Sequence, residues 1–271
     1  MKPIISVIIP MYNCDQYIKE TIGSVVGQDF TDWEVLAVDD CSTDNTYEVV
    51  AGLARLDSRV KLFKMPVNTR GPAGPRNYGI NIAQGKYICF LDSDDIWPVN
   101  KLSMQYRIME DESADFSSGE KVSFMETPLV KEVKNAEKNI SDIKYFDLLM
   151  KNKINTSAVM LRKDILKNLK FDEDVKYAAV EDYKLWLDLH RSKPSLKSIR
   201  IKAPLMNYRV HRDGISRSKL KQLGKVYRVL KSHLENNKNI FLIPLFLSSY
   251  VIQSLYREQL QQKFMNRVFY K

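Results

Sequence analysis

The sequence predicts an α/β fold with a mostly parallel, doubly wound sheet and helices on both faces. Three observations lead to this prediction. Short apolar runs rich in β-branched residues alternate with segments of helical periodicity in the first half of the chain. Polar turns separate these segments, and strand–helix alternation is typical of parallel sheets. The 271 residues, 44% hydrophobic and 28% charged, suffice for one large or two small globular domains.

The elements of the first half follow in order. Four short apolar runs predict strands, at residues 4–9, 33–38, 60–63 and 87–91. Apolar residues at helical spacing predict three helices between them, at residues 18–26, around residues 49–53 and at residues 76–83.

The second half is less regular. The charged stretch 128–139 predicts a surface loop, residues 156–161 a strand, and residues 181–189 a helix. From Lys219 onward the chain has the periodicity of helices.

The charge is concentrated at the C-terminus. The net charge is +9, and residues 219–271 alone hold ten Lys/Arg against two Glu. Such a tail predicts attachment to an anionic membrane surface or a nucleic acid, whereas the alternative is a solvated helix face. The aromatic residues of the tail lie in an apolar block rather than among the basic residues, which disfavours nucleic acid.

That apolar block, residues 240–252, has 13 residues, and a bilayer span needs about 20. Pro244 is expected to interrupt any helix there. With basic residues on both sides, the block suits a helix lying in a membrane interface. Packing on the body of the protein, or in a homodimer, explains the block equally well.

The cysteines and the N-terminus indicate a reducing compartment. Cys14, Cys41 and Cys89 lie far apart in sequence, so neither a disulfide framework nor a structural zinc site is expected. The N-terminus is not expected to be a signal peptide, because its apolar stretch has only about six residues.

Carboxylates follow two of the predicted strands. Asp39 and Asp40 end the second, and Asp92 and Asp94 follow the fourth. Parallel strands collect such residues in one crevice, where crowded carboxylates suit Mg²⁺ or Mn²⁺ and a nucleoside diphosphate. Acidic turn residues without a shared ligand are the alternative. The sequence has no GxGxxG, no P-loop and no GxSxG motif.

Seven segments together resemble the family 2 glycosyltransferases, which have the GT-A fold. The nucleotide-binding half of that family is matched by SVIIPMYN, VDDCSTDNT, GPAGPRNYGI and ICFLDSDDIW, and the acceptor half by NTSAVMLRKDIL, FDEDVKYAAVEDYKLWL and YRVHRDGIS. The resemblance implies a nucleotide-sugar-binding half at residues 1–102 and an acceptor-binding half at residues 103–218. Residues 219–271 would be a helical extension.

The resemblance also implies roles on the donor side. Uracil would be bound by Pro10, Tyr12, Asn13 and Asp40, with the ring of Tyr12 against the base, and Arg76 would lie near the diphosphate. In the DxD motif, Asp92 and Ser93 would contact the nucleotide, and Asp94 would bind Mn²⁺ or Mg²⁺. His211 would reach the metal or the diphosphate.

On the acceptor side, the resemblance implies a catalytic base in the pair Glu181–Asp182, with Asp182 favoured. Taken alone, two acidic residues at a helix start also suit the helix dipole. Trp186 and Arg209 would contact the acceptor, although Trp186 is also suited to packing. One base opposite the leaving group predicts inversion, so that an α-linked UDP-sugar gives a β-linked product.

The implied function is synthesis of a bacterial surface polysaccharide, such as O-antigen or capsule. The acceptor would be a saccharide on a polyisoprenyl diphosphate, and the enzyme would lie peripherally on the cytoplasmic face of the inner membrane. A nucleotidyltransferase is the rival enzyme class, but it needs a Gly-rich, basic signature near the N-terminus, which SVIIPMYNCDQY lacks. A nucleic-acid-binding protein is the non-enzymatic alternative.

Overall fold

The computed structural model describes residues 2–211, 219–235 and 240–252. The chain divides into two compact units. The first comprises residues 1–143 and 154–216, and the second comprises residues 144–153 and 217–271.

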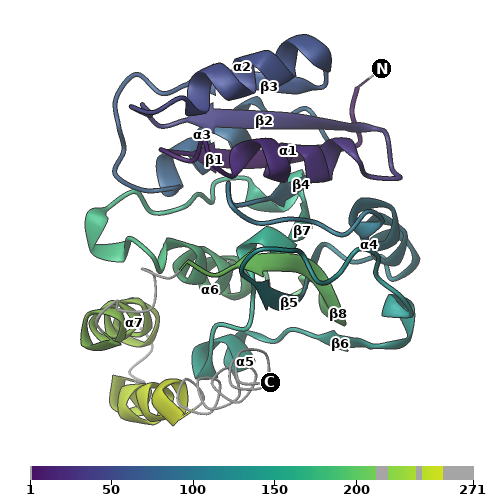
Figure 1. The fold of residues 1–271 in the computed structure, drawn as a ribbon. Helices are drawn as coiled ribbons and strands as arrows, with labels where there is room; N and C mark the ends of the chain where they lie inside the picture. Colours follow the sequence, from purple (N-terminus) through teal and green to yellow (C-terminus); the bar gives the residue numbers. More distant parts are fainter. Residues whose placement is uncertain (1, 212–218, 236–239, 253–271) are drawn as a thin grey trace, which may run out of the picture. The chain divides into compact units, whose positions relative to one another are not determined.

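The first unit is built on an eight-stranded sheet in the order β3-β2-β1-β4-β7-β5-β8-β6 (Figure 1). Its first four strands run parallel: β1 (Ile5–Met11), β2 (Trp33–Asp39), β3 (Val60–Lys64) and β4 (Tyr87–Phe90). The predicted α/β class and all four predicted strands are confirmed. From β1 the chain continues to β2 on one side of β1, and it later returns to the opposite side of β1 as β4. Ligands bind where the strand order reverses in this way, so a ligand site is expected at the carboxyl ends of β1 and β4.

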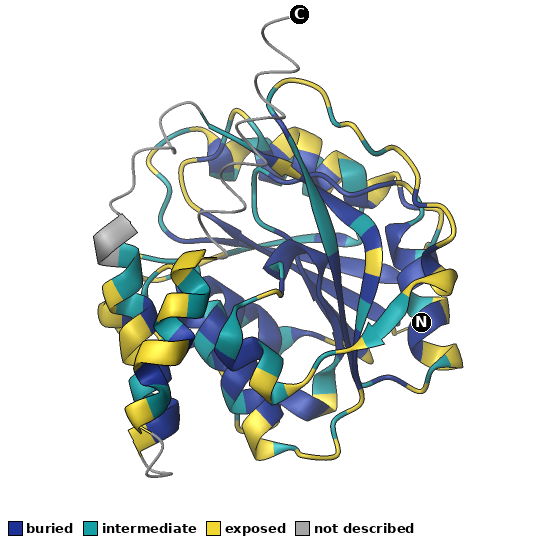
Figure 2. Cartoon of the chain, turned by 90° about the horizontal axis from the view of Figure 1, so that it is seen from below, coloured by how far each residue is buried: buried dark blue, intermediate teal, exposed yellow. Residues whose placement is uncertain are grey.

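Helices cover both faces of this sheet. Ile5, Val7 and Ile9 of β1 face α1 (Ile18–Val26) and α2 (Thr46–Leu56) in one core. The sequence did not predict α4 (Lys101–Asp111), whose apolar residues join the same core. The opposite face bears α3 (Ala73–Ile82) and α6 (Glu181–Ser192). The strands β1 and β2 are buried along their whole length (Figure 2).

Gly79 lets α3 lie directly on β1. A Cβ at this position would meet Cγ2 of Ile8 at 2.5 Å, closer than packed atoms come. The glycine of the segment GPAGPRNYGI therefore sets how closely α3, which carries Arg76, approaches the sheet.

The second half of the sheet is mixed rather than parallel. Its strands are β5 (Phe116–Phe124), β6 (Ile140–Asp142), β7 (Met160–Arg162) and β8 (Ser198–Arg209). β7 runs antiparallel to both β4 and β5, whereas β5 and β8 are parallel. The strand predicted at residues 156–161 is partly wrong, because Thr156–Ala158 form a 3₁₀ turn, η2, and β7 begins only at Met160.

Three further 3₁₀ turns lie among the described residues of this unit: η1 (Ala136–Lys138), η3 (Lys163–Leu166) and η4 (Val175–Tyr177). The loop predicted at residues 128–139 is largely irregular as expected, but Val133 and Ala136 are buried in it.

The second unit contains α5 (Tyr145–Met150), α7 (Lys219–Leu234) and η7 (Ile240–Leu242), and residues 243–252 are helical. Pro244 does not interrupt this last helix. It lies in the first turn, where its missing N–H would have no helical partner anyway. Within the part of the chain that the structure describes, no helix is long and apolar enough to cross a membrane.

Candidate active site

The DxD loop leaves β4 at the carboxyl edge of the sheet. The side chain of Ser157 binds both ends of this loop. Its Oγ accepts from the backbone N–H of Asp92 at 3.1 Å and donates to Oδ2 of Asp95 at 2.7 Å. The indole N–H of Trp97 in turn donates to the carbonyl oxygen of Ser157 at 2.7 Å. Asp95 is 1% exposed, and burial together with Asp92 and Asp94 raises its pKa well above the usual range. Asp95 therefore supports the loop, while Asp92 and Asp94 stay accessible.

The end of β8 holds the same loop from another side. The side chain of Arg209 donates from Nε to the carbonyl oxygen of Asp94 at 2.9 Å and pairs with Glu20 of α1 at 2.5 Å. It is 6% exposed. The expected contact of Arg209 with the acceptor is therefore wrong, because its guanidinium is enclosed and fixes the position of the DxD loop.

Asp94 and His211 form the candidate metal pair. Nε2 of His211 lies 2.7 Å from Oδ2 of Asp94, and both side chains are partly exposed. A carboxylate and an imidazole suit Mn²⁺, and Mg²⁺ and Mn²⁺ commonly take their remaining oxygens from phosphates and water. No group of three or more His, Cys, Asp or Glu suited to a metal occurs among the described residues. This pair fits an ion that arrives with a diphosphate.

Arg76 joins the DxD loop to the start of α6. Its two terminal nitrogens lie 2.6 Å from Oδ1 of Asp92 and 3.1 Å from Oε1 of Glu181. The side chain is 4% exposed and lies over the ring of Phe171. Burial lowers the pKa of Arg76, but the carboxylates of Asp92 and Glu181 outweigh it and raise that pKa overall. Arg76 is thus a permanent cation that fixes both carboxylates.

Asp182 follows Glu181 in the first turn of α6. Its Oδ2 accepts from the hydroxyl of Thr156 at 2.9 Å, and its Oδ1 accepts from its neighbour's backbone N–H at 2.6 Å. Removal from water and the charge of Glu181 raise the pKa of Asp182 to about 6, although Arg76 and Thr156 lower it. Such a carboxylate is largely ionised near neutrality yet basic enough to accept a proton.

The carboxylates after β2 have partners of their own. Asp39 accepts from the backbone N–H of Ser42, and both carboxylate oxygens of Asp40 accept from the backbone N–H of Thr69 at 2.9 and 3.0 Å. Both residues are buried. The expectation that four carboxylates crowd around one cation is therefore wrong, and only Asp92 and Asp94 remain accessible to a metal.

The other predicted donor residues lie just inside or beyond the ends of β1 and β4. Pro10 is buried within the strand, and Tyr12 just beyond it is 52% exposed. The side chain of Asn13 accepts from the backbone N–H of Thr43, which joins the loops after β1 and β2. The backbone carbonyl of Ser93 accepts from Thr21 of α1 at 2.9 Å.

Trp186 is wrongly predicted as an acceptor contact. It is 0% exposed and packs against the rings of Phe90, Phe116 and Phe171. The alternative interpretation, a packing residue, is correct.

Sequence reasoning missed the residues that support the site. Asp95, Thr156, Ser157, Thr69 and Glu20 hold the predicted residues in place. A polar Thr-Ser pair before an apolar strand was the available signal.

Comparison with known proteins gives one family. The model of glycosyl transferase family 2 matches residues 6–169. The chain is 34% identical to the UDP-Glc:alpha-D-GlcNAc-diphosphoundecaprenol beta-1,3-glucosyltransferase WfaP of Escherichia coli, over 84% of this chain and 86% of that protein.

Two solved structures share the fold. The TarS 1-349 fragment of S. aureus in complex with UDP-GlcNAc has a TM-score of 0.70 at 21% identity, covering 91% of this chain and 71% of that one. The mannosyltransferase PcManGT of Pyrobaculum calidifontis, in complex with GDP-Man and Mn²⁺, has a TM-score of 0.66 at 19% identity, over 91% and 70%. The predicted GT-A architecture is confirmed by this likeness.

Proposed function

Because the chain belongs to glycosyl transferase family 2, we propose that it is an inverting transferase that uses a UDP-sugar. The acceptor is a hydroxyl of a saccharide carried on a polyisoprenyl diphosphate, in the assembly of a bacterial surface polysaccharide. The E. coli relative is named for UDP-Glc and a GlcNAc-diphosphoundecaprenol acceptor, so glucose is the first donor sugar to test. The observation that carries the proposal is that Arg76 joins Asp92 of the DxD loop to Glu181, the neighbour of Asp182 at the start of α6.

The donor is held at the ends of β1, β2 and β4. Tyr12 is exposed for packing on uracil, and Asn13 and Asp40 lie in the two loops beside it. Asp94 and His211 would hold Mn²⁺ or Mg²⁺ against the diphosphate. When bound there, the ion supplies a Lewis acid for charge that develops on the leaving diphosphate.

The base is Asp182. It would accept the proton of the acceptor hydroxyl at Oδ1 or Oδ2 as the hydroxyl oxygen bonds to the anomeric carbon. Arg76 pairs with the neighbouring carboxylate of Glu181, so Asp182 is the carboxylate of this pair that is left to accept the proton. A base on the face opposite the leaving group permits one displacement only, which inverts the anomeric centre.

A coupled assay for released UDP tests this function. UDP should accumulate from UDP-glucose only when a GlcNAc-diphosphoprenol acceptor is present, and omission of the divalent ion should lower the rate. If UDP is released only with sugar phosphates, or never with any UDP-sugar in a donor panel, the proposal is wrong.

The hydroxyl of Thr156 tunes the base. Because its hydrogen bond lowers the pKa of Asp182, Thr156→Val should raise that pKa and move the acid limb of the kcat–pH profile to higher pH. Thr156→Ser keeps the hydroxyl and is the matched control, with a profile close to wild type. An unchanged acid limb in Thr156→Val would show that another group sets it.

The C-terminal extension is proposed to attach the enzyme to an anionic membrane surface. Its ten Lys/Arg against two Glu provide the charge, and Phe241, Leu245 and Ile252 expose apolar side chains. Each basic residue near such a surface contributes about 1 kcal/mol. Vesicle binding of the full chain should therefore weaken as salt is raised, whereas salt-independent binding would contradict attachment by charge.

A further inference from the structure

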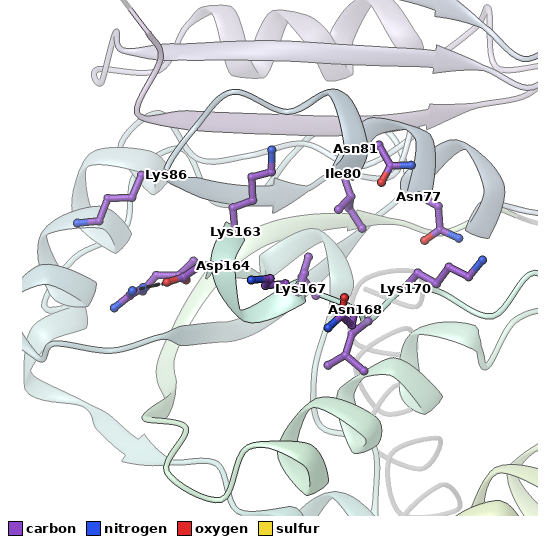
Figure 3. A pocket seen from close by; sticks show the side chains of 12 residues that line it. Asn77, Ile80, Asn81, Lys86, Lys163, Asp164, Lys167, Asn168 and Lys170 are labelled. Atoms are coloured by element: carbon purple, nitrogen blue, oxygen red, sulfur yellow. Dashed lines mark hydrogen bonds and ion pairs between the residues drawn. The ribbon is translucent and has the colours of Figure 1, made fainter.

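A groove rich in basic residues lies beside α3, on the face of the sheet opposite α1. Its volume is about 760 Å³, and α3, the start of β4 and the segment from β7 to residue 170 form its walls. Figure 3 shows the side chains of Lys163, Lys167 and Lys170 spread along the groove, with Lys86 at one end and Lys170 near Asn77 at the other. No part of the proposed mechanism uses these residues.

The charge of the groove is strongly one-sided. Of the residues that the structure describes, five cations line the groove, Lys86, Arg162, Lys163, Lys167 and Lys170, but only one carboxylate, Asp164.

Two of these cations are neutralised and three are not. Lys86 pairs with Glu110, and Arg162 pairs with Asp164. The ammonium of Lys163 donates to the backbone carbonyl of Ala83, which leaves its charge uncompensated. Among the described residues, Lys167 and Lys170 are both exposed and have neither an ion pair nor a hydrogen bond from the side chain. Three uncompensated cations on one concave surface indicate an anionic ligand.

The lining also has an apolar part. Ile80 and Leu166, which are buried, and Leu169, which is half-buried, also line the groove. Lysine side chains keep their aliphatic stems on apolar surface and place the ammonium at the rim. A soluble phosphate needs only the cations, whereas an amphiphile with a phosphate head uses both parts of this lining.

The groove is separate from the catalytic crevice. Lys86 precedes β4 while Asp92 follows it, and the backbone N–H of Lys163 donates to the carbonyl of Lys86, so this end lies where the parallel strands begin. At the other end, Asn77 and Lys170 line the groove, but their chain neighbours Arg76 and Phe171 are buried and do not. A ligand in the groove therefore would not touch Asp182 or Asp94.

We propose that this groove binds the phosphate headgroup of an anionic phospholipid and so holds the catalytic unit itself on a membrane surface. This contact is distinct from the C-terminal extension, because every residue of the groove belongs to the first unit.

The test compares two charge-reversed double variants of the full-length chain. The first is Lys167→Glu with Lys170→Glu, in the groove. The matched control is Lys134→Glu with Lys138→Glu, which changes the charge equally at two exposed lysines of the same unit outside the groove. Co-sedimentation is measured with phosphatidylglycerol-containing vesicles and with phosphatidylcholine vesicles, at low and high salt.

The groove variant should lose at least about tenfold in partition onto anionic vesicles at low salt, since each lysine near such a surface contributes about fivefold. The control variant should lose markedly less. UDP-induced thermal stabilisation should be the same in both, which separates this proposal from the proposed function. If the charge reversal unfolds the protein, Lys167→Gln with Lys170→Gln replaces it.

Three outcomes would overturn the proposal. Equal losses in the groove and control variants would mean that only net charge matters. Stabilisation of the wild type, but not of the groove variant, by inorganic phosphate, with vesicle binding unchanged, would make the groove a soluble-anion site. Equal partition onto neutral and anionic vesicles would exclude headgroup recognition.

Discussion

Asp182→Asn should lower turnover by at least ~100-fold and change UDP affinity by no more than a few-fold. A general base contributes about 10²–10⁴ in rate, and an amide of the same shape cannot accept the proton. Asp182 accepts its hydrogen bonds from Thr156 and from its own helix rather than from the donor-side loops, so donor binding should not depend on it. Turnover is measured by UDP release, and affinity by calorimetric titration of UDP.

Asp188→Asn is the matched control, because this carboxylate lies on the same helix and pairs with Lys184 instead of lining the site. It should leave turnover near the wild-type value. If Asp182→Asn also remains active, the base is another group. Glu181 is a poor substitute, since Arg76 already pairs with it.

Asp94→Ala should abolish the metal-dependent part of UDP binding. Asp94 and His211 are the accessible pair that fits a divalent ion. Removal of the Asp94 carboxylate leaves only the imidazole of His211 to bind the ion. A ligand at 100 times its Kd stabilises a protein by about 2.7 kcal/mol, which a thermal-shift assay with UDP and Mn²⁺ detects easily. That shift should fall to the smaller one seen with UDP alone.

Two comparisons make this result specific. Asp111→Ala, at an exposed position at the end of α4, should leave the metal-dependent shift unchanged. Asp40→Ala should weaken UDP binding with and without metal, because this carboxylate holds the loop at Thr69 beside the expected base pocket. Metal-dependent binding of UDP by Asp94→Ala at wild-type strength would contradict the assignment.

The first half of the fold was predictable because its strands are continuous apolar runs. Strands β1 and β2 are buried on both sides, so hydrophobicity alone marks them. β8 escaped prediction because it includes charged residues and Pro204, which lacks a backbone N–H. The structure accommodates this residue at an irregularity, where the register with β5 shifts around Glu120.

The site residues at the ends of strands were predictable from the sequence, whereas the residues that hold them in place were not. The DxD loop and the Glu181–Asp182 pair stand out in sequence because polar residues there interrupt apolar segments. The partners of Arg76 lie 16 and 105 residues away in the chain, so no local pattern could reveal that it joins Asp92 to Glu181. Trp186 and Arg209 were misjudged because their burial depends on aromatic and acidic partners far away in sequence.

The most direct test of the account is the configuration of the new glycosidic bond. Proton NMR would follow the reaction of an α-linked UDP-sugar with a GlcNAc-diphosphoprenol acceptor by the anomeric coupling of the first product formed. A single displacement with Asp182 as base predicts a β-linked product from the earliest time point. An α-linked product would contradict the mechanism, because retention requires a different arrangement of reacting groups.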